Sequence, residues 1–293
     1  MKYSDNSYKI GAIIVLYNPS EKMLKSCIES IVVQVDEICI IDNSAKDNKQ
    51  YFRTNSNKVH YEPLVKNVGI AAAQNIGIKY FKEKNFDFVI FSDQDSTSPN
   101  FLVQSLVESY LKLSTKINIS CIGPIPINRK TGHPYLYKQC ILDKREDFGI
   151  EYYVMHSIIS SYSLVPMENF STVGLMDERL FIDFVDQEWC WRAAKYNDKI
   201  CVMLPMIEIE HELGVSSKFM GHNINLSSPF RIYYQTRNLL WLCRKTYVPS
   251  YWKNMNMKKI VIKFFYYSIV PNNRMLYCFK MLKGFYDGIT KHL

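Results

Sequence analysis

Short apolar runs alternate with longer amphipathic segments through the first half of the chain. Runs rich in β-branched and aromatic residues predict strands, whereas apolar residues at every third or fourth position predict helices. The predicted strands are residues 9–17, 37–41, 59–62, 88–91 and 119–122. The predicted helices start near residues 20, 70 and 98. Strands separated by helices predict an α/β fold with a mostly parallel central sheet flanked by helices.

The pattern changes in the second half of the chain. Residues 128–152 are polar and irregular, which predicts a long loop, and strand character resumes at 153–165 and again at 200–210. From about residue 228 onward the pattern is helical and basic. We therefore expect an α/β domain at residues 1–227 and a helical, basic and aromatic C-terminal region at residues 228–293.

The distribution of charge predicts a binding partner for the C-terminal region. The formal net charge is +8, and residues 244–293 alone carry +9, interleaved with aromatic residues. Such a segment is typical of proteins that lie on an anionic membrane surface. Two alternatives are a tail that packs its aromatic residues inward and a nucleic-acid-binding tail. We expect the membrane surface and no nucleic acid.

Targeting signals and cysteines indicate in which cellular compartment the protein is expected. No apolar run reaches the roughly 18 residues needed to cross a bilayer, and the N-terminal segment lacks the apolar core of a secretory signal. The eight cysteines lack metal-site spacing, which predicts reduced thiols, most of them in the core. These features favour a cytoplasmic protein that is peripherally associated with the inner face of the cell membrane.

Two carboxylates follow the buried strand at residues 88–91. Asp93 and Asp95 flank Gln94 where that strand ends. Ligands of open parallel sheets bind beyond the carboxyl ends of the strands, and carboxylate oxygens suit hard divalent cations that hold diphosphates. The triplet alone is weak evidence, because the same residues are common in ordinary turns.

Further polar residues fall at the ends of other predicted elements. Asp42 follows the second strand, Asp183, Asp186 and Glu188 open a helix, and His211 ends a strand. Acidic residues at a helix start also stabilise its dipole, and a single histidine is often structural. The order of the motifs, rather than any one of them, carries the functional signal.

That order resembles the family-two inverting glycosyltransferases of the GT-A fold, and most of all the bacterial rhamnosyltransferases that use dTDP-L-rhamnose. The resemblance covers residues 10–247. The matching motifs are Asp42-Asn43-Ser44, Lys66-Asn67-Val68-Gly69, Asn75-Ile76-Gly77, Asp93-Gln94-Asp95, the stretch 181–189 with Arg192, His211, and Arg231, Tyr234, Arg237 and Asn238.

The resemblance implies a role for each matched position. Asp42 would accept the N3–H of a thymine or uracil base, and Asp93 would face the ribose. Asp95 and His211 would be the ligands of a Mg²⁺ or Mn²⁺ ion on the diphosphate. The other nucleotide-sugar-binding positions would be Tyr17, Asn67, Gly69, Asn75, Gln94, Arg231 and Arg237.

The reacting groups follow from the same resemblance. Asp186 would be the general base, since inverting transfer needs one carboxylate to deprotonate the attacking hydroxyl. The acceptor site would include Asp183, Glu188 and Trp189. Tyr162 stands where relatives often have glycine, so it would narrow that site.

The sequence therefore predicts an inverting, metal-dependent glycosyltransferase with a GT-A domain at residues 1–227. We expect it to move L-rhamnose from dTDP-L-rhamnose to a lipid-linked oligosaccharide in the synthesis of a bacterial surface polysaccharide such as capsule or O-antigen. UDP-galactofuranose, UDP-glucose and UDP-N-acetylglucosamine are alternative donors. A non-catalytic nucleotide-sugar-binding scaffold is the alternative from another class.

Overall fold

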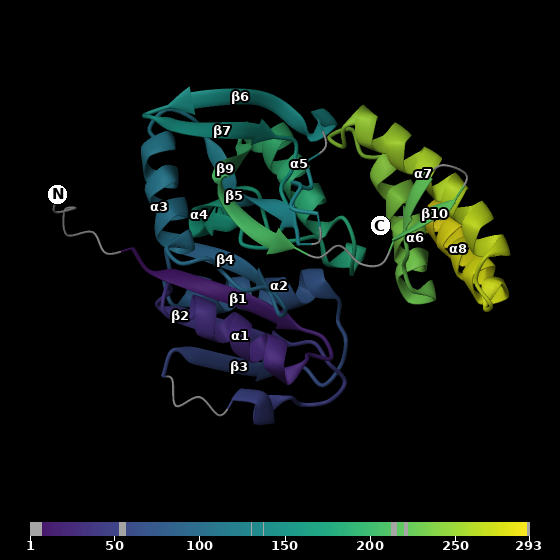
Figure 1. Ribbon diagram of the computed structural model, residues 1–293, viewed down its shortest axis with the longest axis horizontal. Coiled ribbons are helices and arrows are strands. Elements are labelled where there is room, and N and C mark those ends of the chain that lie inside the picture. The colour runs from purple at the N-terminus through teal and green to yellow at the C-terminus, as the bar shows by residue number, and fades with distance from the viewer. Residues whose placement is uncertain are drawn as a thin grey trace.

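The computed structural model describes residues 8–52, 57–129, 131–136, 138–211, 216–219 and 222–291. At 52, 211, 216–219 and 222–225 only the backbone is described. A nine-stranded sheet in the order β3-β2-β1-β4-β8-β5-β9-β7-β6 forms the centre of the larger part, and a group of three helices lies beside it (Figure 1).

One half of the sheet is parallel, as the alternating pattern predicted. Its strands are β1 (Ile10–Leu16), β2 (Glu37–Asp42), β3 (Val59–Pro63) and β4 (Phe88–Asp93). The helices between them are α1 (Glu21–Ile31), α2 (Ile70–Glu83) and α3 (Leu102–Leu113), with the short helix η1 at Lys49–Phe52. All pairings among these four strands are parallel, so their carboxyl ends meet at one edge.

The other half is mixed, which corrects the expectation of a mostly parallel sheet. β8 (Leu164–Pro166) runs antiparallel between β4 and β5 (Ile119–Asn128). β9 (Ile200–His211) is parallel to β5 but antiparallel to β7 (Ile150–Met155). The helices here are α4 (Met167–Thr172) and α5 (Val185–Asn197), with the short helices η2 (Lys138–Cys140) and η3 (Glu178–Leu180). The strands β10 (Ser216–Phe219) and β11 (His222–Asn225) form a separate two-stranded sheet.

The predicted loop at residues 128–152 is wrong in part. The strand β6 (Ile141–Asp147) forms an antiparallel hairpin with β7 at the edge of the sheet. Five of its seven residues are exposed, in the sequence Leu142-Asp143-Lys144-Arg145-Glu146. A strand that is polar on both faces has no apolar alternation, so the hydrophobic pattern could not reveal it.

The hydrophobic core forms two layers, one on each face of the sheet. In β1, Ala12, Ile14 and Leu16 belong to one layer with α1 and α3, whereas Ile13 belongs to the other with α2 and α5. Successive side chains of a strand point to opposite faces, so a strand buried on both faces is apolar throughout. All eight cysteines are free and five of them are buried, as expected from their spacing.

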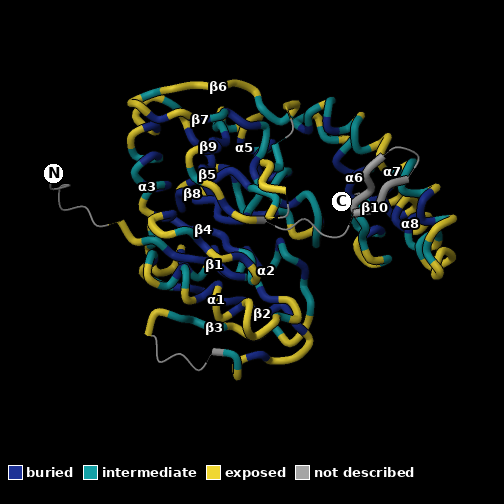
Figure 2. Tube along the Cα trace, viewed as in Figure 1, coloured by how far each residue is buried: buried dark blue, intermediate teal, exposed yellow. Residues whose placement is uncertain are grey.

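The C-terminal region consists of α6 (Pro229–Cys243), α7 (Ser250–Ile269) and α8 (Arg274–Thr290). Leu239, Leu242 and Trp252 belong to the same core layer as α5, so α6 and the start of α7 are packed into the α/β domain. By contrast, long stretches of α7 and α8 are exposed (Figure 2). Among the described residues, no helix combines the length and apolarity required to cross a bilayer.

Two glycines allow α8 to approach α6 closely. A Cβ atom added at Gly284 would lie 2.6 Å from the carbonyl oxygen of Tyr233, and one at Gly288 would lie 3.0 Å from that of Arg237. The spacing of four residues places both glycines on one face of α8. Backbone contact with α6 therefore fixes how α8 is rotated about its own axis.

Replacing Gly284 by Ala should destabilise the protein, because the new methyl group must displace a backbone oxygen. We expect the free energy of unfolding to fall by roughly 1–3 kcal/mol, the usual cost of overpacking. Urea denaturation of Gly284→Ala measures it, with Lys283→Ala on the exposed side of the same helix as control, expected within about 0.5 kcal/mol of the parent. A more stable Gly284→Ala protein would show that only helix propensity matters here.

Candidate active site

The predicted nucleotide residues lie around the carboxyl end of β1. In the strand register Leu16 pairs with Asp42 of β2, and Val15 pairs with Asp93 of β4. Adjacent strands lie 4.7–4.9 Å apart, so the two acidic residues are about 10 Å apart across β1. The parallel topology therefore brings together two carboxylates that are distant in the sequence.

Gln94 joins the ends of β1 and β4. Its Oε1 accepts a hydrogen bond from the backbone N–H of Tyr17 at 2.8 Å, and its Nε2 donates to the carbonyl oxygen of Tyr17 at 3.2 Å. The ring of Tyr17 remains about half exposed, and the neighbouring Asp95 is exposed. Gln94 thus fixes the edge of the site, while Tyr17 and Asp95 are accessible there.

Asp42 organises the loop that follows β2. Its Oδ1 accepts from the Ser44 N–H at 3.0 Å, and its Oδ2 accepts from Tyr61 at 2.7 Å and from both the backbone and the side chain of Asn48 at 3.1 and 2.8 Å. Burial opposes ionisation of Asp42, but these hydrogen bonds outweigh it, so the pKa is lowered from its ordinary value. The residue is fully buried.

An asparagine pair orders the loop before α2. The Asn43 side chain accepts from the Val68 N–H at 2.7 Å and donates to Asn67 Oδ1 at 2.9 Å, which also accepts from the Gly69 N–H at 2.9 Å. Gly69 has φ of +89°, and a Cβ atom there would lie 2.6 Å from the carbonyl oxygen of Phe181. Only glycine fits both the backbone conformation and the contact.

Asn75 holds α2 to a distant loop. It is buried, and its amide exchanges hydrogen bonds with the backbone of Met176 at 3.0 and 2.9 Å and donates to Glu178 at 2.9 Å. All of these contacts are within the protein. The structure therefore gives Asn75 a positioning role behind the site.

Asp186 lies in the first turn of α5, beside a cavity of about 210 Å³. Its Oδ2 accepts from the Ser160 N–H at 3.2 Å and its Oδ1 from the Gln187 N–H at 2.8 Å. Burial raises the pKa of Asp186 to about 6, and the nearby charge of Asp93 acts in the same direction. The cavity is lined by Ile70, Gln74, Ser160, Asp183, Phe184, Val185, Asp186 and Arg231.

Asp183 faces the same cavity but has a cationic partner. Its carboxylate accepts from the Arg231 guanidinium at 2.5 and 3.3 Å, and its side chain is only 9% exposed. In contrast, the described hydrogen bonds to Asp186 come from backbone N–H groups. A base must be able to accept a proton near neutral pH, so Asp186 fits this role better than Asp183.

The turn that carries Asp183 has an unusual backbone. Phe181, Asp183 and Phe184 all have φ between +65° and +67°, and Ile182 N–H donates to the Leu180 carbonyl at 2.7 Å in a γ-turn. Such conformations are strained and persist only when surrounding contacts impose them. Here they place the two acidic side chains beside one cavity.

Asn238 of α6 supplies those contacts. Its side-chain amide donates to the carbonyl oxygens of Leu180 and Ile182 at 2.9 Å and of Asp183 at 3.4 Å. The neighbouring Arg237 donates to the carbonyl oxygen of Arg179 at 2.6 Å. Asn238 belongs to the matched motif at residues 231–238, but its role could not be predicted because nothing in the sequence shows that α6 meets this turn.

Two predicted acceptor residues do not face the cavity. Tyr162 is fully buried in the core layer on the α1 and α3 side, because its N–H donates to the Phe91 carbonyl at 2.7 Å and turns the ring behind the sheet. Glu188 is 1% exposed and forms an ion pair with Arg192 at 2.8 Å. Neither side chain lines the 210 Å³ cavity, whereas Ser160 does.

The remaining predicted residues have mixed outcomes. Trp189 is 2% exposed and donates to the Gly174 carbonyl at 2.8 Å, so it packs in the core next to Asp186 rather than facing the 210 Å³ cavity. The guanidinium of Arg237 is bound to backbone carbonyls instead of facing a ligand site. His211 ends β9, and its side chain lies outside the described residues.

Known proteins with similar sequences are glycosyltransferases. The model of the family "Glycosyl transferase family 2" matches residues 12–174. The dTDP-rhamnosyl transferase RfbF of Shigella flexneri is 35% identical over 291 residues, which cover 96% of this chain and 95% of RfbF. An uncharacterized glycosyltransferase, RP339 of Rickettsia prowazekii, is 29% identical over 61% of this chain and 57% of its own length.

Solved structures support the fold. GalNAc-T7, crystallised with UDP, GalNAc and Mn²⁺, superposes with a TM-score of 0.57 at 18% identity, covering 91% of this chain and 57% of GalNAc-T7. Residues 1–349 of S. aureus TarS, in complex with UDP-GlcNAc, superpose with a TM-score of 0.57 at 13% identity, covering 96% of this chain and 81% of TarS. With a GT-A fold and a family match over more than half its length, the chain belongs to glycosyl transferase family 2.

Proposed function

We propose that this glycosyltransferase moves L-rhamnose from dTDP-L-rhamnose to a lipid-linked saccharide, with inversion at the anomeric carbon, during synthesis of a bacterial surface polysaccharide. The near full-length similarity to RfbF supports the donor. The observation that carries the chemistry is Asp186, a half-buried carboxylate with a pKa of about 6 that lines the cavity of about 210 Å³.

Asp186 acts as the general base. Inversion in one step requires a group that removes the proton of the acceptor hydroxyl as it attacks. A pKa close to the working pH leaves Asp186 mostly ionised but still able to take up a proton. The N–H of Ser160 holds one of its oxygens at 3.2 Å and so fixes the direction of the carboxylate. Asp183, paired with Arg231, orients the sugar rather than accepting the proton.

A divalent cation, Mg²⁺ or Mn²⁺, fits the residues at the end of β4. Asp95 is exposed at the edge of the site and Asp93 ends the strand, so both offer the hard oxygen donors that such ions bind. When bound, the ion would supply Lewis-acid stabilisation to the departing diphosphate. Asp95 would hold it, with His211 as a further ligand, while Asp93 contacts the ribose.

The nucleotide pocket lies between the loops that Asp42 and Asn67 order. Tyr17 and the backbone at Gly69 border it, and Gln94 keeps Tyr17 in place. Asp42 contributes the acceptor for the N3–H of the base. Because its carboxylate is fully buried and bonded to Ser44, Asn48 and Tyr61, the base must displace one of these donors.

The C-terminal region holds the enzyme at an anionic membrane surface, where a lipid-linked acceptor would reside. Residues 244–293 carry +9, and side chains such as Phe265, Phe279 and Tyr286 are at least half exposed. Lys and Arg near an anionic bilayer each contribute about 1 kcal/mol to binding.

Asp186→Asn should reduce kcat by about 10²-fold or more, because the amide cannot accept the proton. Donor affinity should change little. In the parent enzyme kcat/KM should rise with pH up to about 6 and then level off. Only the ionised carboxylate can accept the proton, and below its pKa of about 6 Asp186 is mostly protonated. The matched variant Asp183→Asn should keep this pH profile. If Asp183→Asn removes the acid limb and Asp186→Asn retains it, Asp183 is the base.

Asp95→Ala should nearly abolish turnover, and EDTA should do the same to the parent enzyme, with recovery on adding Mn²⁺ or Mg²⁺. The reason is that the departing diphosphate then lacks its cation. Rates of sugar transfer with and without chelator measure the effect. Glu151→Ala, exposed in β7 near the far edge of the sheet, serves as the control. Full activity in EDTA would contradict the metal proposal.

Calorimetry with nucleoside diphosphates tests the pocket. Thymidine and uridine diphosphates should bind at least tenfold more tightly than adenosine diphosphate. The N1 of adenine carries no hydrogen, and a site that must satisfy a buried hydrogen bond discriminates against groups that cannot make it. A panel of nucleotide sugars then separates dTDP-L-rhamnose from the UDP-linked donors. Equal affinity for adenosine diphosphate would overturn the base-recognition model and the proposed donor.

A further inference from the structure

The outer face of α8 is apolar and exposed. Met275, Phe279, Leu282, Tyr286 and Ile289 follow one another at intervals of four and three residues, and each is between 47% and 84% exposed. This spacing places all five on one stripe of the helix. The opposite side of α8 carries Gly284 and Gly288 and is in contact with α6. The stripe therefore points away from the protein.

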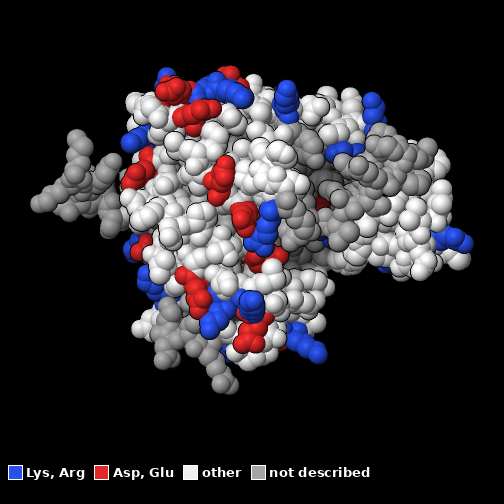
Figure 3. All heavy atoms as spheres, in the orientation of Figure 1, with Lys and Arg blue, Asp and Glu red and all other residues white. Residues whose placement is uncertain are grey.

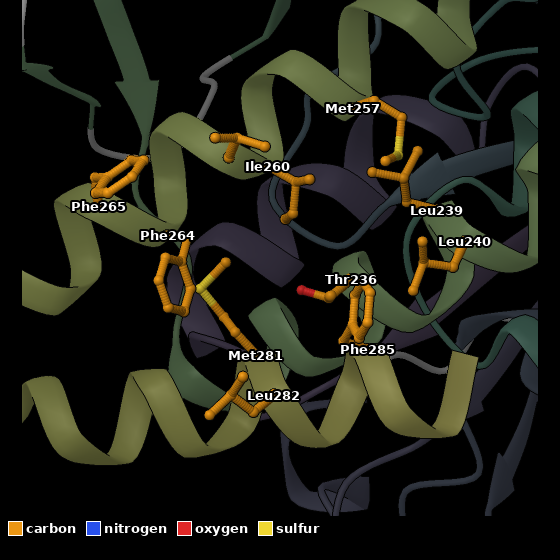
Figure 4. Close-up of a pocket in the computed structure, with 11 residues that line it drawn as sticks. Thr236, Leu239, Leu240, Met257, Ile260, Phe264, Phe265, Met281, Leu282 and Phe285 are labelled. Atoms are coloured by element: carbon orange, nitrogen blue, oxygen red, sulfur yellow. The ribbon is translucent and has the colours of Figure 1, made fainter. Parts of the chain in front are cut away.

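A groove opens beside this stripe. It has a volume of about 330 Å³ and lies between α6, α7 and α8, and Figure 4 shows their side chains converging on it. Its lining includes Leu240, Val261, Phe264, Leu282 and Phe285. The lining residues are apolar except Thr236, whose hydroxyl donates to the Ile232 carbonyl at 2.8 Å. The volume is within the range of small-ligand pockets, and the groove offers an occupant apolar contacts alone.

The charges around the groove favour an anionic surface. Residues 244–293 contain ten Lys or Arg and a single acidic residue, Asp287. Asp287 is buried and accepts from Tyr233 at 2.6 Å, so it is not available to a partner. The charged side chains visible at the outer end of the C-terminal helices in Figure 3 are Lys or Arg. A second copy of the chain would bring like charges together, which opposes self-association through this face.

We propose that the groove between α6, α7 and α8 holds one hydrocarbon chain of an anionic, phosphate-bearing lipid, while the stripe of α8 rests at the boundary between headgroups and acyl chains. This inference deepens the proposed membrane attachment and rests on it. Lys258, exposed on α7 one turn before Val261, is placed to meet the phosphate. An apolar chain joined to a negative headgroup matches both properties of this surface.

Other side chains of α6 and α7, outside the groove, reach the catalytic cavity. Lys263 of α7 donates to Gln235 Oε1 at 2.8 Å, and Gln235 Nε2 lies 3.4 Å from Asp183 Oδ1. Asp183 lines the cavity that contains Asp186. Lipid bound at the C-terminal helices would therefore bring the bilayer surface close to the site where a lipid-linked acceptor must enter.

Calorimetry on the full chain with dodecyl phosphate, below its micelle concentration, tests the groove. We expect one molecule to bind at least tenfold more tightly than ethyl phosphate, which lacks the chain, and than dodecyl maltoside, which lacks the charge. Lys258→Gln should reduce the advantage over dodecyl maltoside. Absence of dodecyl phosphate binding would overturn the proposal.

Two matched variants separate the groove from general surface insertion. Val261→Glu and Ile269→Glu introduce the same charge on α7 at positions that are 52% and 61% exposed, but only Val261 lines the groove. We expect Val261→Glu to weaken dodecyl phosphate binding by tenfold or more and Ile269→Glu by less than threefold. Both should reduce co-sedimentation with phosphatidylglycerol vesicles at low salt. Equal loss of dodecyl phosphate binding in the two variants would overturn the proposal that the groove holds the hydrocarbon chain.

Two further measurements keep the outcomes distinct. Binding of thymidine diphosphate checks that each variant is folded, and it tests the proposed donor site independently of the lipid site. If thymidine diphosphate fails to bind the parent while dodecyl phosphate binds, the donor proposal fails and the groove stands. A concentration-dependent dimer in light scattering, disrupted by Val261→Glu, would assign the groove to a second copy instead and overturn the lipid proposal.

Discussion

The active site depends on one asparagine that holds a strained turn in place. The turn at residues 181–184 contains three non-glycine residues with positive φ, a conformation that costs free energy at each position. The amide of Asn238 donates to the carbonyl oxygens of Ile182 and Asp183 in this turn and of Leu180 just before it, and the turn leads directly into α5. Without these bonds the backbone would relax, and Asp183 and Asp186 would no longer lie beside the same cavity.

Because α6 holds this turn, the C-terminal helices do not form a unit that is independent of the α/β domain. Asn238 belongs to α6, and Tyr247, between α6 and α7, donates to the buried Glu188 at 2.8 Å. The composition changes near residue 228, but the core layer of the α/β domain extends through α6 to Trp252. The part of the chain that meets the proposed membrane surface is thus packed against the part that orders the turn at residues 181–184.

The features that depend on local pattern could be predicted from the sequence. The parallel strands are apolar because they are buried on both faces, and the topology places Asp42 and Asp93 at one edge. The direction of a side chain within a helix or loop was harder to predict. Glu188 resembles an active-site residue by its position, yet its face of α5 turns inward to Arg192. Tyr162 points behind the sheet because a backbone hydrogen bond to β4 fixes its loop, which no residue pattern reveals.

The edge strand β6 has a consequence for the behaviour of the protein in a crowded cell. An exposed strand edge offers unpaired N–H and C=O groups on which another chain can build a sheet. Here that edge carries Asp143, Lys144, Arg145 and Glu146 in succession, all of them exposed. Adding a strand there would bring these charges into contact with a neighbouring chain and strip their water. The segment that the hydrophobic pattern failed to identify thus protects the sheet from aggregation.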